Sequence, residues 1–373
     1  MDLENNMKPP FHADHVGSLL RPTEMAEARI RFSEGKISAE NLREIENEHI
    51  RHAMRQQENV GLKAVTDGEF RRSFWHYDFM GMLTGLDLEE RDEGIAFAGA
   101  TLRPIFPVIN DKLDFPDDHP MLEHYRFVAE NTSVHPKISI PGPSCCHFRI
   151  AIEDIRPLEY HDPEVLMNDI MLTYRKAVEV FYEHGCRYLQ MDDIFFAYLC
   201  DPVHRKAKSD IGQDPDWLIR KYAWMMEQAI KNRPDDMVIG MHLCRGNFKS
   251  THAAEGSYDP IADILFNQTG VDIFFMEYDT NRAGSLEPLK YLPKGNQRVL
   301  PGFVTTKSGD LESRDEILRK FDLVAQITNI DQFGLAPQCG FASTEEGNTL
   351  SDLEQWKKLE FIVSVAEEIW GEV

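Results

Sequence analysis

The chain lacks any run of eighteen consecutive apolar residues, so the sequence contains no candidate for a helix that crosses a membrane. Its first ten residues are mainly polar and have no apolar signal-peptide core, and we therefore expect a cytoplasmic protein. Basic residues are scarce, because 40 Lys and Arg stand against 63 Asp and Glu, and the formal net charge is −23. Such an acidic chain is expected to bind neither nucleic acid nor an anionic membrane.

Cysteine is also sparse. The six cysteines lie at positions 145, 146, 186, 200, 244 and 339. This pattern does not indicate the disulfide framework of a small secreted domain, and most free cysteines are small buried residues. The sequence has no low-complexity linker, and 42% of its 373 residues are hydrophobic, which is enough for a sizeable core. We therefore expect residues 1–373 to form a single domain.

The chain does contain a recurring physical pattern, in which an amphipathic helix is followed by a short apolar strand. An Asp-Pro pair opens three of these helices, with the aspartates at positions 162, 214 and 259 and proline at the first helical position. A fourth helix is predicted over 313–329. Repeated helix–strand units of this kind are typical of a parallel sheet whose strands are buried on both faces.

Eight strands are predicted in total, and this number favours a closed (β/α)8 TIM barrel over an open sheet. The predicted strands cover residues 11–18, 62–68, 135–142, 187–193, 237–244, 271–278, 298–305 and 332–338. Residues 23–59 predict an N-terminal helical segment that is interrupted near Gly35. Residues 70–133 make a long insertion after the second strand, with a hairpin expected around 95–109. This insertion is expected to be a lid, an oligomer contact or a surface decoration.

Chemically active residues gather where the predicted strands end, which is the face that carries the active site in barrel enzymes. His242 and Cys244 lie two residues apart on one strand, so their side chains point to the same face. Glu277 ends the next strand and Cys339 the eighth. One nitrogen, two sulfurs and one carboxylate oxygen are ligands that Zn²⁺ takes in tetrahedral geometry. The alternative is that the two cysteines and the histidine are ordinary core residues.

The chemistry of this ligand set favours thiol activation over water activation. Two thiolates and one carboxylate leave zinc electron-rich, which suits a bound thiolate that must remain nucleophilic. Other strand ends fit an amino-acid thiol, because Glu69 and Asp192 could hold its ammonium group. The backbone around Val16, Gly17 and Ser18, together with the Ser18 hydroxyl, could hold its carboxylate. Helix capping and salt bridging are the alternative roles for these acidic residues.

At these residues the sequence resembles the C-terminal catalytic barrel of cobalamin-independent methionine synthase, and most closely the short single-barrel relatives of that enzyme. The matching stretches are HVGSLLRP (15–22), VTDGEF (65–70), IPGPS (140–144), LQMDD (189–193), GMHLCRGN (240–247), FFMEYD (274–279) and LAPQCGF (335–341). The resemblance implies that the family's zinc ligands fall on His242, Cys244, Glu277 and Cys339. It also implies that the homocysteine-binding residues fall on Val16, Gly17, Ser18, Glu69 and Asp192.

Three departures separate this chain from the full-length family. The chain has no room for the second, N-terminal barrel that helps to bind the folate donor. A tryptophan near the folate is absent, and residues 145–148 (CCHF) fill that stretch. The histidine thought to protonate the leaving amine is also absent. When the sequences are aligned on GFVTTKS (302–308), Lys307 takes its place.

The sequence therefore predicts a zinc-dependent methyltransferase that moves a methyl group to homocysteine and forms methionine. The expected donor is 5-methyltetrahydrofolate or a glutamylated form, and the candidate catalytic residues are Asp192 and Lys307, or a water chain in place of the lysine. A methyl transferase that uses methylcobalamin or another small donor remains an alternative. So do a barrel enzyme like uroporphyrinogen decarboxylase, a metal-dependent hydrolase and a non-catalytic zinc-binding or thiol-binding protein. The expected partners are small molecules, and a homo-oligomer is left open.

Overall fold

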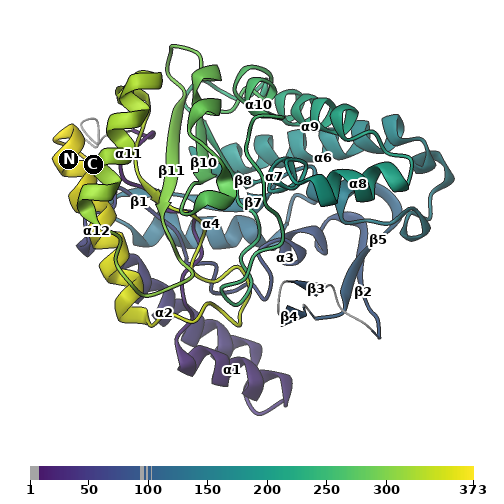
Figure 1. The fold of residues 1–373 in the computed structure, drawn as a ribbon. Helices are drawn as coiled ribbons and strands as arrows, with labels where there is room; N and C mark the ends of the chain where they lie inside the picture. Colours follow the sequence, from purple (N-terminus) through teal and green to yellow (C-terminus); the bar gives the residue numbers. More distant parts are fainter. Residues whose placement is uncertain (1–7, 93–95, 98–99, 102) are drawn as a thin grey trace.

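The computed structural model describes residues 8–92, 96–97, 100–101 and 103–373 (Figure 1). The described chain starts with two helices, α1 (Thr23–Ser33) and α2 (Ala39–Asn59), which confirm the predicted helical segment and its interruption near Gly35. Gly35 has a φ of +69°, a conformation that ends a helix at little cost for glycine. The Ser38 side chain then accepts a hydrogen bond from the backbone N–H of Asn41 and caps α2.

The centre of the protein is a six-stranded parallel sheet whose neighbouring strands follow one another in the sequence. Its strands are β7 (Ile138–Pro141), β8 (Tyr188–Asp192), β9 (Val238–Leu243), β10 (Ile273–Glu277), β11 (Arg298–Val304) and β12 (Ala336–Pro337). All but the first residues of β9 and β11 are buried, as expected for strands covered on both faces. The prediction of a mixed α/β fold with a parallel sheet is confirmed.

Both edges of this sheet continue into the N-terminal part of the chain. Beyond β12, Ala13 forms a parallel bridge with Leu335. Beyond β7, β6 (His135–Pro136) pairs in parallel with β1 (Ala64–Val65). A small hydrophobic cluster joins side chains from both edges and from the middle of the sheet. Its members are Phe11, Val16, Ala64, Tyr188, Ile273, Phe275, Leu300 and Ala336. Because one cluster unites these strands, the sheet is curled.

A buried ion pair fastens the N-terminal segment to the interior of the curled sheet. The Nζ atom of Lys137, between β6 and β7, lies 3.1 Å from Oδ1 of Asp14, and the Tyr188 hydroxyl donates to the other carboxylate oxygen at 2.5 Å. The lysine is completely buried, and its ammonium group lies 4.2 Å from the centre of the Phe275 ring. A buried charge needs such a partner, so these contacts hold three segments together.

The predicted strands 11–18, 62–68 and 332–338 are shorter in the structure than expected. The first contributes one bridge at Ala13, and β1 and β12 have two residues each. Gly17 and Gly68 have positive φ values of 134° and 66°, and Glu69 has a φ of 60°. The chain therefore turns out of the sheet at these points, and the local backbone cannot continue the ladder.

The predicted hairpin around 95–109 has different boundaries in the structure. β2 (Thr84–Glu90) pairs antiparallel with β5 (Ile105–Asp114), so the hairpin is wider than predicted. Within it, β3 (Ala96–Phe97) pairs with β4 (Ala100–Thr101), and the rest of the predicted turn lies outside the described residues. The short helix α3 (Tyr77–Met80) precedes this hairpin, and α4 (Pro120–Asn131) leads into β6.

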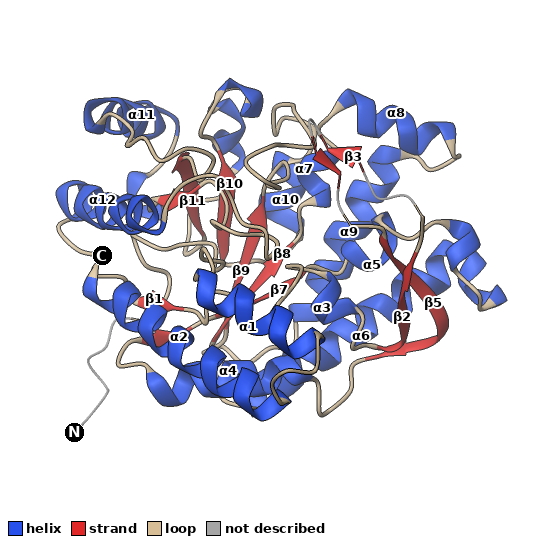
Figure 2. Ribbon diagram, turned by 90° about the horizontal axis from the view of Figure 1, so that it is seen from below, coloured by secondary structure: helices blue, strands red, loops and turns tan. Residues whose placement is uncertain are grey.

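The remaining helices connect the strands and cover the sheet (Figure 2). They are α5 (Cys145–Phe148), α6 (Pro163–Glu183), α7 (Phe195–Tyr198), α8 (Pro202–Asp210), α9 (Pro215–Ile230), α10 (Ala262–Gln268), α11 (Arg314–Ile327) and α12 (Asp352–Trp370). Asp162 and Asp214 cap α6 and α9 as predicted. The third Asp-Pro prediction was wrong, because α10 begins at Ala262 and the Asp259 side chain accepts a hydrogen bond from Ser257 instead.

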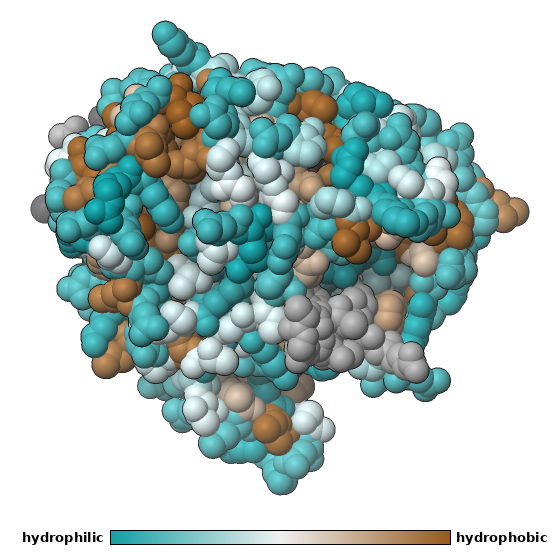
Figure 3. All heavy atoms as spheres, viewed as in Figure 1, coloured by the Kyte–Doolittle hydropathy of each residue, from teal (hydrophilic) through white to brown (hydrophobic). Residues whose placement is uncertain are grey.

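The face of the molecule shown in Figure 3 is largely hydrophilic. On the face shown in Figure 3, apolar side chains occur as separate small patches among polar ones. Among the helices that the structure describes, none combines the length and apolar character needed to span a lipid bilayer.

The N-terminal cap of helix α12 allows a test of how capping stabilises the fold. Ser351 and Glu354 form a capping box, in which each side chain accepts a hydrogen bond from the other residue's backbone N–H. We expect Ser351→Ala to lower the free energy of unfolding by about 1 kcal/mol, because the backbone N–H of Glu354 loses the hydroxyl that accepts its hydrogen bond. Urea denaturation measures this change. Ser209→Ala, at an exposed position near the end of α8, is the control and should leave the stability unchanged.

Candidate active site at the carboxyl ends of the strands

The parallel strands deliver the predicted functional residues to one end of the sheet. Asp192 is the last residue of β8, and its neighbour across the ladder is His242 of β9. Cys244 directly follows β9, and Cys339 follows β12 after one intervening residue. In a parallel sheet the carboxyl ends lie at the same edge, so residues from distant parts of the sequence meet here.

Three of the four predicted metal ligands lie within reach of one cation. The ligand atoms of His242, Cys244 and Cys339 are all within 4.8 Å of one another, and all three residues are buried. Zinc bonds to sulfur and nitrogen measure about 2.0–2.3 Å, so one ion can bridge atoms at this spacing after small side-chain movements. The Nδ1 atom of His242 lies 3.5 Å from Oδ1 of Asp192, an arrangement that orients a metal-binding imidazole.

Glu277 lies outside this group of three. Its Oε1 atom accepts a hydrogen bond from Arg282 at 2.9 Å, and its Oε2 atom accepts one from the backbone N–H of Arg245 at 2.8 Å. Both oxygens of this fully buried carboxylate therefore have protein partners. Its charge still acts on the sulfur group, because Glu277 contributes to raising the pKa of Cys244. The role of Glu277 as a fourth ligand stays a prediction.

The two sulfurs have opposite protonation preferences. A hydrogen bond from Cys244 and the neighbouring His242 hold the pKa of Cys339 well below its usual value. The same hydrogen bond, together with burial, raises the pKa of Cys244. Burial opposes a charge on His242, but the Cys339 thiolate and Asp192 outweigh it and raise the pKa of this imidazole to about 10. A divalent cation would replace the protons that balance these charges.

The structure places Lys307 beside the sulfur group but outside the wall of the cavity. Its ammonium group helps to lower the pKa values of Glu277 and Cys339. Its Nζ atom is buried and has no hydrogen-bond partner among the residues that the structure describes. Lys307 therefore acts electrostatically on Glu277 and Cys339, and its predicted role as a proton donor remains a prediction.

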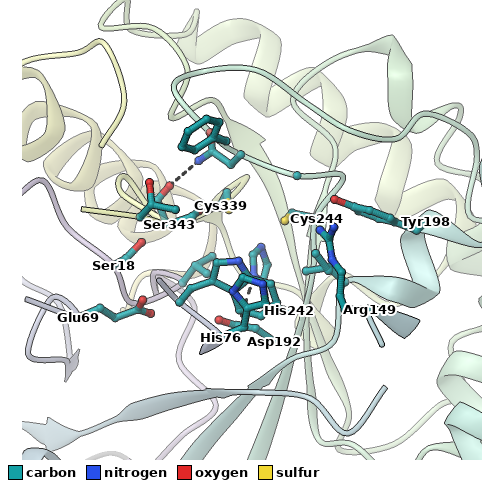
Figure 4. Close-up of a pocket in the computed structure, with 18 residues that line it drawn as sticks. Ser18, Glu69, His76, Arg149, Asp192, Tyr198, His242, Cys244, Cys339 and Ser343 are labelled. Carbon is teal, nitrogen blue, oxygen red and sulfur yellow. Dashed lines mark hydrogen bonds and ion pairs between the residues drawn. The ribbon is translucent and has the colours of Figure 1, made fainter. Parts of the chain in front are cut away.

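The residues predicted to bind an amino acid line the same cavity as the sulfur group. Val16, Ser18, Glu69 and Asp192 all contribute to its wall (Figure 4). Gly17 supports this wall from behind, because a Cβ there would lie 3.3 Å from both Glu69 Oε1 and Ser139 Oγ, at a φ of +134°. A Cβ on Gly340 would approach Ser18 Oγ to 1.9 Å, so glycine is required next to Cys339.

Glu69 is held in an unusual electrostatic state. Its Oε1 atom accepts a hydrogen bond from Ser139 Oγ at 2.8 Å, and its Oε2 atom lies 3.6 Å from the guanidinium of Arg72. Burial raises the pKa of Glu69 to about 7, and Asp192 adds to this effect although Arg72 opposes it. A carboxyl group with this pKa ionises readily when a cation such as an ammonium group arrives.

The sequence prediction missed several residues of the cavity wall. They include Trp75, His76, Arg149, Ile194, Tyr198, Phe248, Ser343 and Thr344. Arg149 and Tyr198 lie at the ends of α5 and α7, one helical turn beyond the polar ends of β7 and β8. In the sequence, only the short separation of Arg149 and Tyr198 from the ends of β7 and β8 could have indicated a place in the site, and many residues share that property. Trp75 and His76 belong to the long connection before β6, where sequence alone carried no indication of a site.

A curled parallel sheet with imidazole, thiol and carboxylate groups at its carboxyl edge defines an α/β enzyme whose site contains residues that could hold a metal ion. The chain belongs to the cobalamin-independent methionine synthase family, which is a family of methyltransferases. Residues 11–367 match the family model described as the catalytic domain of the cobalamin-independent synthase. This match confirms the resemblance that the sequence motifs indicated.

Three relatives illustrate the range of similarity. The uncharacterized protein YxjG of Bacillus subtilis is 41% identical over 97% of this chain and 96% of its own length. The structure of the putative vitamin-B12 independent methionine synthase from Listeria monocytogenes is 37% identical, with a TM-score of 0.78, over 98% of this chain and 100% of that one. The 5-methyltetrahydropteroyltriglutamate–homocysteine methyltransferase of Bacillus velezensis is 23% identical over 91% of this chain, which spans only 41% of that protein.

Proposed function

We propose that this protein is a zinc-dependent methyltransferase that moves a methyl group to the thiol of homocysteine and so forms methionine. The observation that carries this proposal is the close group of His242, Cys244 and Cys339 in a cavity that Glu69 and Asp192 also line. Zinc bound there would lower the pKa of the substrate thiol so that it reacts as a thiolate.

The residues of the chain would bind the rest of the amino acid. Glu69 and Asp192 would hold the ammonium group, and the Ser18 hydroxyl with the neighbouring backbone would hold the carboxylate, and the lining of one cavity by these residues supports this assignment. Asp192 would also orient the imidazole of His242, because its Oδ1 atom lies 3.5 Å from Nδ1 of that residue. These contacts would fix the sulfur of the substrate near the metal ligands, in the orientation that transfer requires.

The fold that we propose for this enzyme is one closed (β/α)8 barrel over residues 1–373. The bridge between Ala13 and Leu335 and the pairing of β1 with β6 extend the sheet at both edges. A backbone hydrogen bond of 3.0 Å from Leu19 to Gly68 links these two extensions. The β2–β5 hairpin would then be an insertion that precedes the third strand of the barrel.

The donor that we propose is 5-methyltetrahydrofolate or a glutamylated form, by analogy with the named methyltransferase relative. Lys307, or water next to it, would supply the proton to the leaving amine. Methylcobalamin remains the second candidate donor, because the folate-binding tryptophan and the proton-donating histidine of the family are both replaced in this chain. A barrel enzyme like the decarboxylases would need no zinc, so metal analysis distinguishes it from a zinc methyltransferase that uses either methyl donor.

The decisive experiment compares methyl donors with the purified, zinc-loaded protein. Homocysteine is supplied with methyl-labelled 5-methyltetrahydrofolate carrying one or three glutamates, or with methylcobalamin. We expect labelled methionine from one of these donors and none after removal of zinc. Binding of homocysteine is followed separately through the appearance of a new sulfur ligand in the zinc-edge absorption spectrum. A protein that holds zinc but never binds homocysteine would contradict the proposed acceptor.

The fourth zinc ligand can be tested separately. If Glu277 binds zinc, Glu277→Gln should weaken zinc affinity about tenfold or more, because a neutral amide is a poor ligand. Arg282→Gln is the matched control, since it removes a partner of the same carboxylate but leaves the carboxylate itself. Competition with a zinc-binding dye measures both affinities. If the two variants behave alike, Glu277 serves as a partner of the arginines and is not a ligand.

A further inference from the structure

The cavity has a second polar wall that the proposed function has not used. Figure 4 shows Arg149 and Tyr198 side by side next to Cys244, on the other side of the cavity from Ser18 and Glu69. They come from the chain segments that follow β7 and β8. His76 also lines this cavity. The wall that would bind the amino acid and this second wall therefore face the sulfur group from different sides.

Arg149 has no carboxylate partner in the part of the chain that the structure describes. Among the described residues, no carboxylate lies within ion-pair distance of its guanidinium, and its buried Nε atom has no hydrogen-bond partner. Its guanidinium carbon lies 5.3 Å from the centre of the Phe195 ring and 5.8 Å from that of Tyr198. These rings hold the side chain in place but leave its planar N–H groups available, and such groups match carboxylate or phosphate oxygens.

Two further polar atoms of residues that line the cavity have no hydrogen-bond partner in the part of the chain that the structure describes. The Tyr198 side chain is only 2% exposed, and its hydroxyl makes no hydrogen bond within the described structure. His76 is stacked between Trp75 and Tyr77, with ring centres 4.4 and 3.8 Å away, and its Nδ1 atom is likewise unpaired among described groups. Burial and the charge of Arg149 hold the pKa of His76 well below its usual value. Buried polar atoms are normally satisfied, so these atoms indicate a polar ligand.

We propose that Arg149 and Tyr198 form an anion-binding subsite for the second substrate, so that the methyl donor presents a carboxylate or phosphate group to this wall. The inference rests on the proposed function only in calling that second substrate a methyl donor. The guanidinium also repels positive charge. Purely cationic methyl donors, such as sulfonium ions without an acidic group, are therefore selected against.

The subsite is tested by binding, with the zinc-loaded full chain in the presence of homocysteine. Isothermal calorimetry is run with methylphosphonate and acetate as anionic probes and trimethylsulfonium as a cationic probe. We expect an anionic probe to bind and trimethylsulfonium not to bind. Arg149→Gln should weaken the binding of the anion by at least about tenfold, whereas Arg149→Lys should retain part of it. Tyr198→Phe should have a smaller effect, because it removes one neutral donor.

Lys208→Gln is the matched control. Lys208 carries a positive charge near the same segment, where it donates a hydrogen bond to the Phe148 carbonyl, but it does not line the cavity. Its replacement should leave anion binding unchanged. The subsite would be overturned if Arg149→Gln bound methylphosphonate and acetate as tightly as the wild-type protein does. It would also be overturned if the wild-type protein bound trimethylsulfonium as tightly as it binds the anions. The relative strength of the two anions identifies a phosphate or a carboxylate as the preferred group.

These results are separable from the proposed function. If no donor yields methionine but anion binding still depends on Arg149, the subsite stands and the methyl transfer fails. If methionine forms but Arg149→Gln changes neither the KM of the donor nor the binding of the probes, the proposed function stands and the anion-binding subsite fails.

Discussion

Replacing Cys244 or Cys339 with serine is expected to remove zinc from the purified protein. Each cysteine contributes a sulfur to the group in which all ligand atoms lie within 4.8 Å of one another. A serine hydroxyl stays protonated at neutral pH and is a poor ligand for zinc. Loss of an outer partner alone typically costs about 10–100-fold in metal affinity, so loss of a direct ligand should exceed about 100-fold. Methionine formation should fall with the metal content.

Metal analysis by plasma mass spectrometry measures this result directly. Cys200→Ser is the control, because this buried cysteine lies outside the group and its sulfur hydrogen-bonds to the Phe196 carbonyl, which a serine hydroxyl can also do. The control should keep about one zinc per chain. If both Cys244→Ser and Cys339→Ser retain zinc, the metal is bound at another place in the protein and the proposed ligand set is wrong.

The affinity for an amino acid is expected to rise with pH and to level off above pH 7. The pKa of Glu69 is raised to about 7, so this carboxyl is mostly neutral below that pH. An ammonium group binds the ionised form better, and binding must therefore expel a proton at low pH. The association constant should increase about tenfold per pH unit below the pKa and become flat above it. Glu69→Gln should remove this slope and weaken binding about 100-fold at pH 8.

L-Methionine is the appropriate ligand for this measurement, because it has no thiol whose own proton would add a second pH dependence. Calorimetry between pH 5.5 and 8.5 then reports the slope. Asp193→Asn is the matched control, since burial also raises the pKa of Asp193 to about 7 but this residue hydrogen-bonds to Ser144 and does not line the cavity. If the pH dependence persists in Glu69→Gln and disappears in Asp193→Asn, the titrating group is Asp193 and the prediction for Glu69 is wrong.

Some features of the site could be predicted because they depend on neighbours in the sequence. His242 lies on β9 and Cys244 directly follows it, and the alternation of side chains along extended backbone predicts that both point to one face. The helix starts at Asp162 and Asp214 were correct for the same reason, because an N-cap acts on N–H groups two or three residues away. The start at Asp259 failed when a serine two residues earlier competed for its carboxylate.

Other features depend on contacts between distant segments. Glu277 ends its strand as predicted, yet its carboxylate is engaged by Arg282 and by the backbone of Arg245. The pKa of Glu69 is set chiefly by burial, which no local pattern reveals. The Nε atom of Arg149 has no hydrogen-bond partner among the described residues, and this is visible only when the surroundings of the side chain are known.

The amino-acid sequence by itself determined the order of helices and strands, the parallel arrangement and the identity of the chemical groups at the strand ends, because periodicity and capping are local properties. Tertiary structure alone decided which of these groups meet. Cys339 reaches Cys244 only through the curl of the sheet, and Arg149 and Tyr198 share a wall only because two loops fold over the same edge. Distances of this kind follow from packing of the whole chain, since burial and charge pairing are collective effects.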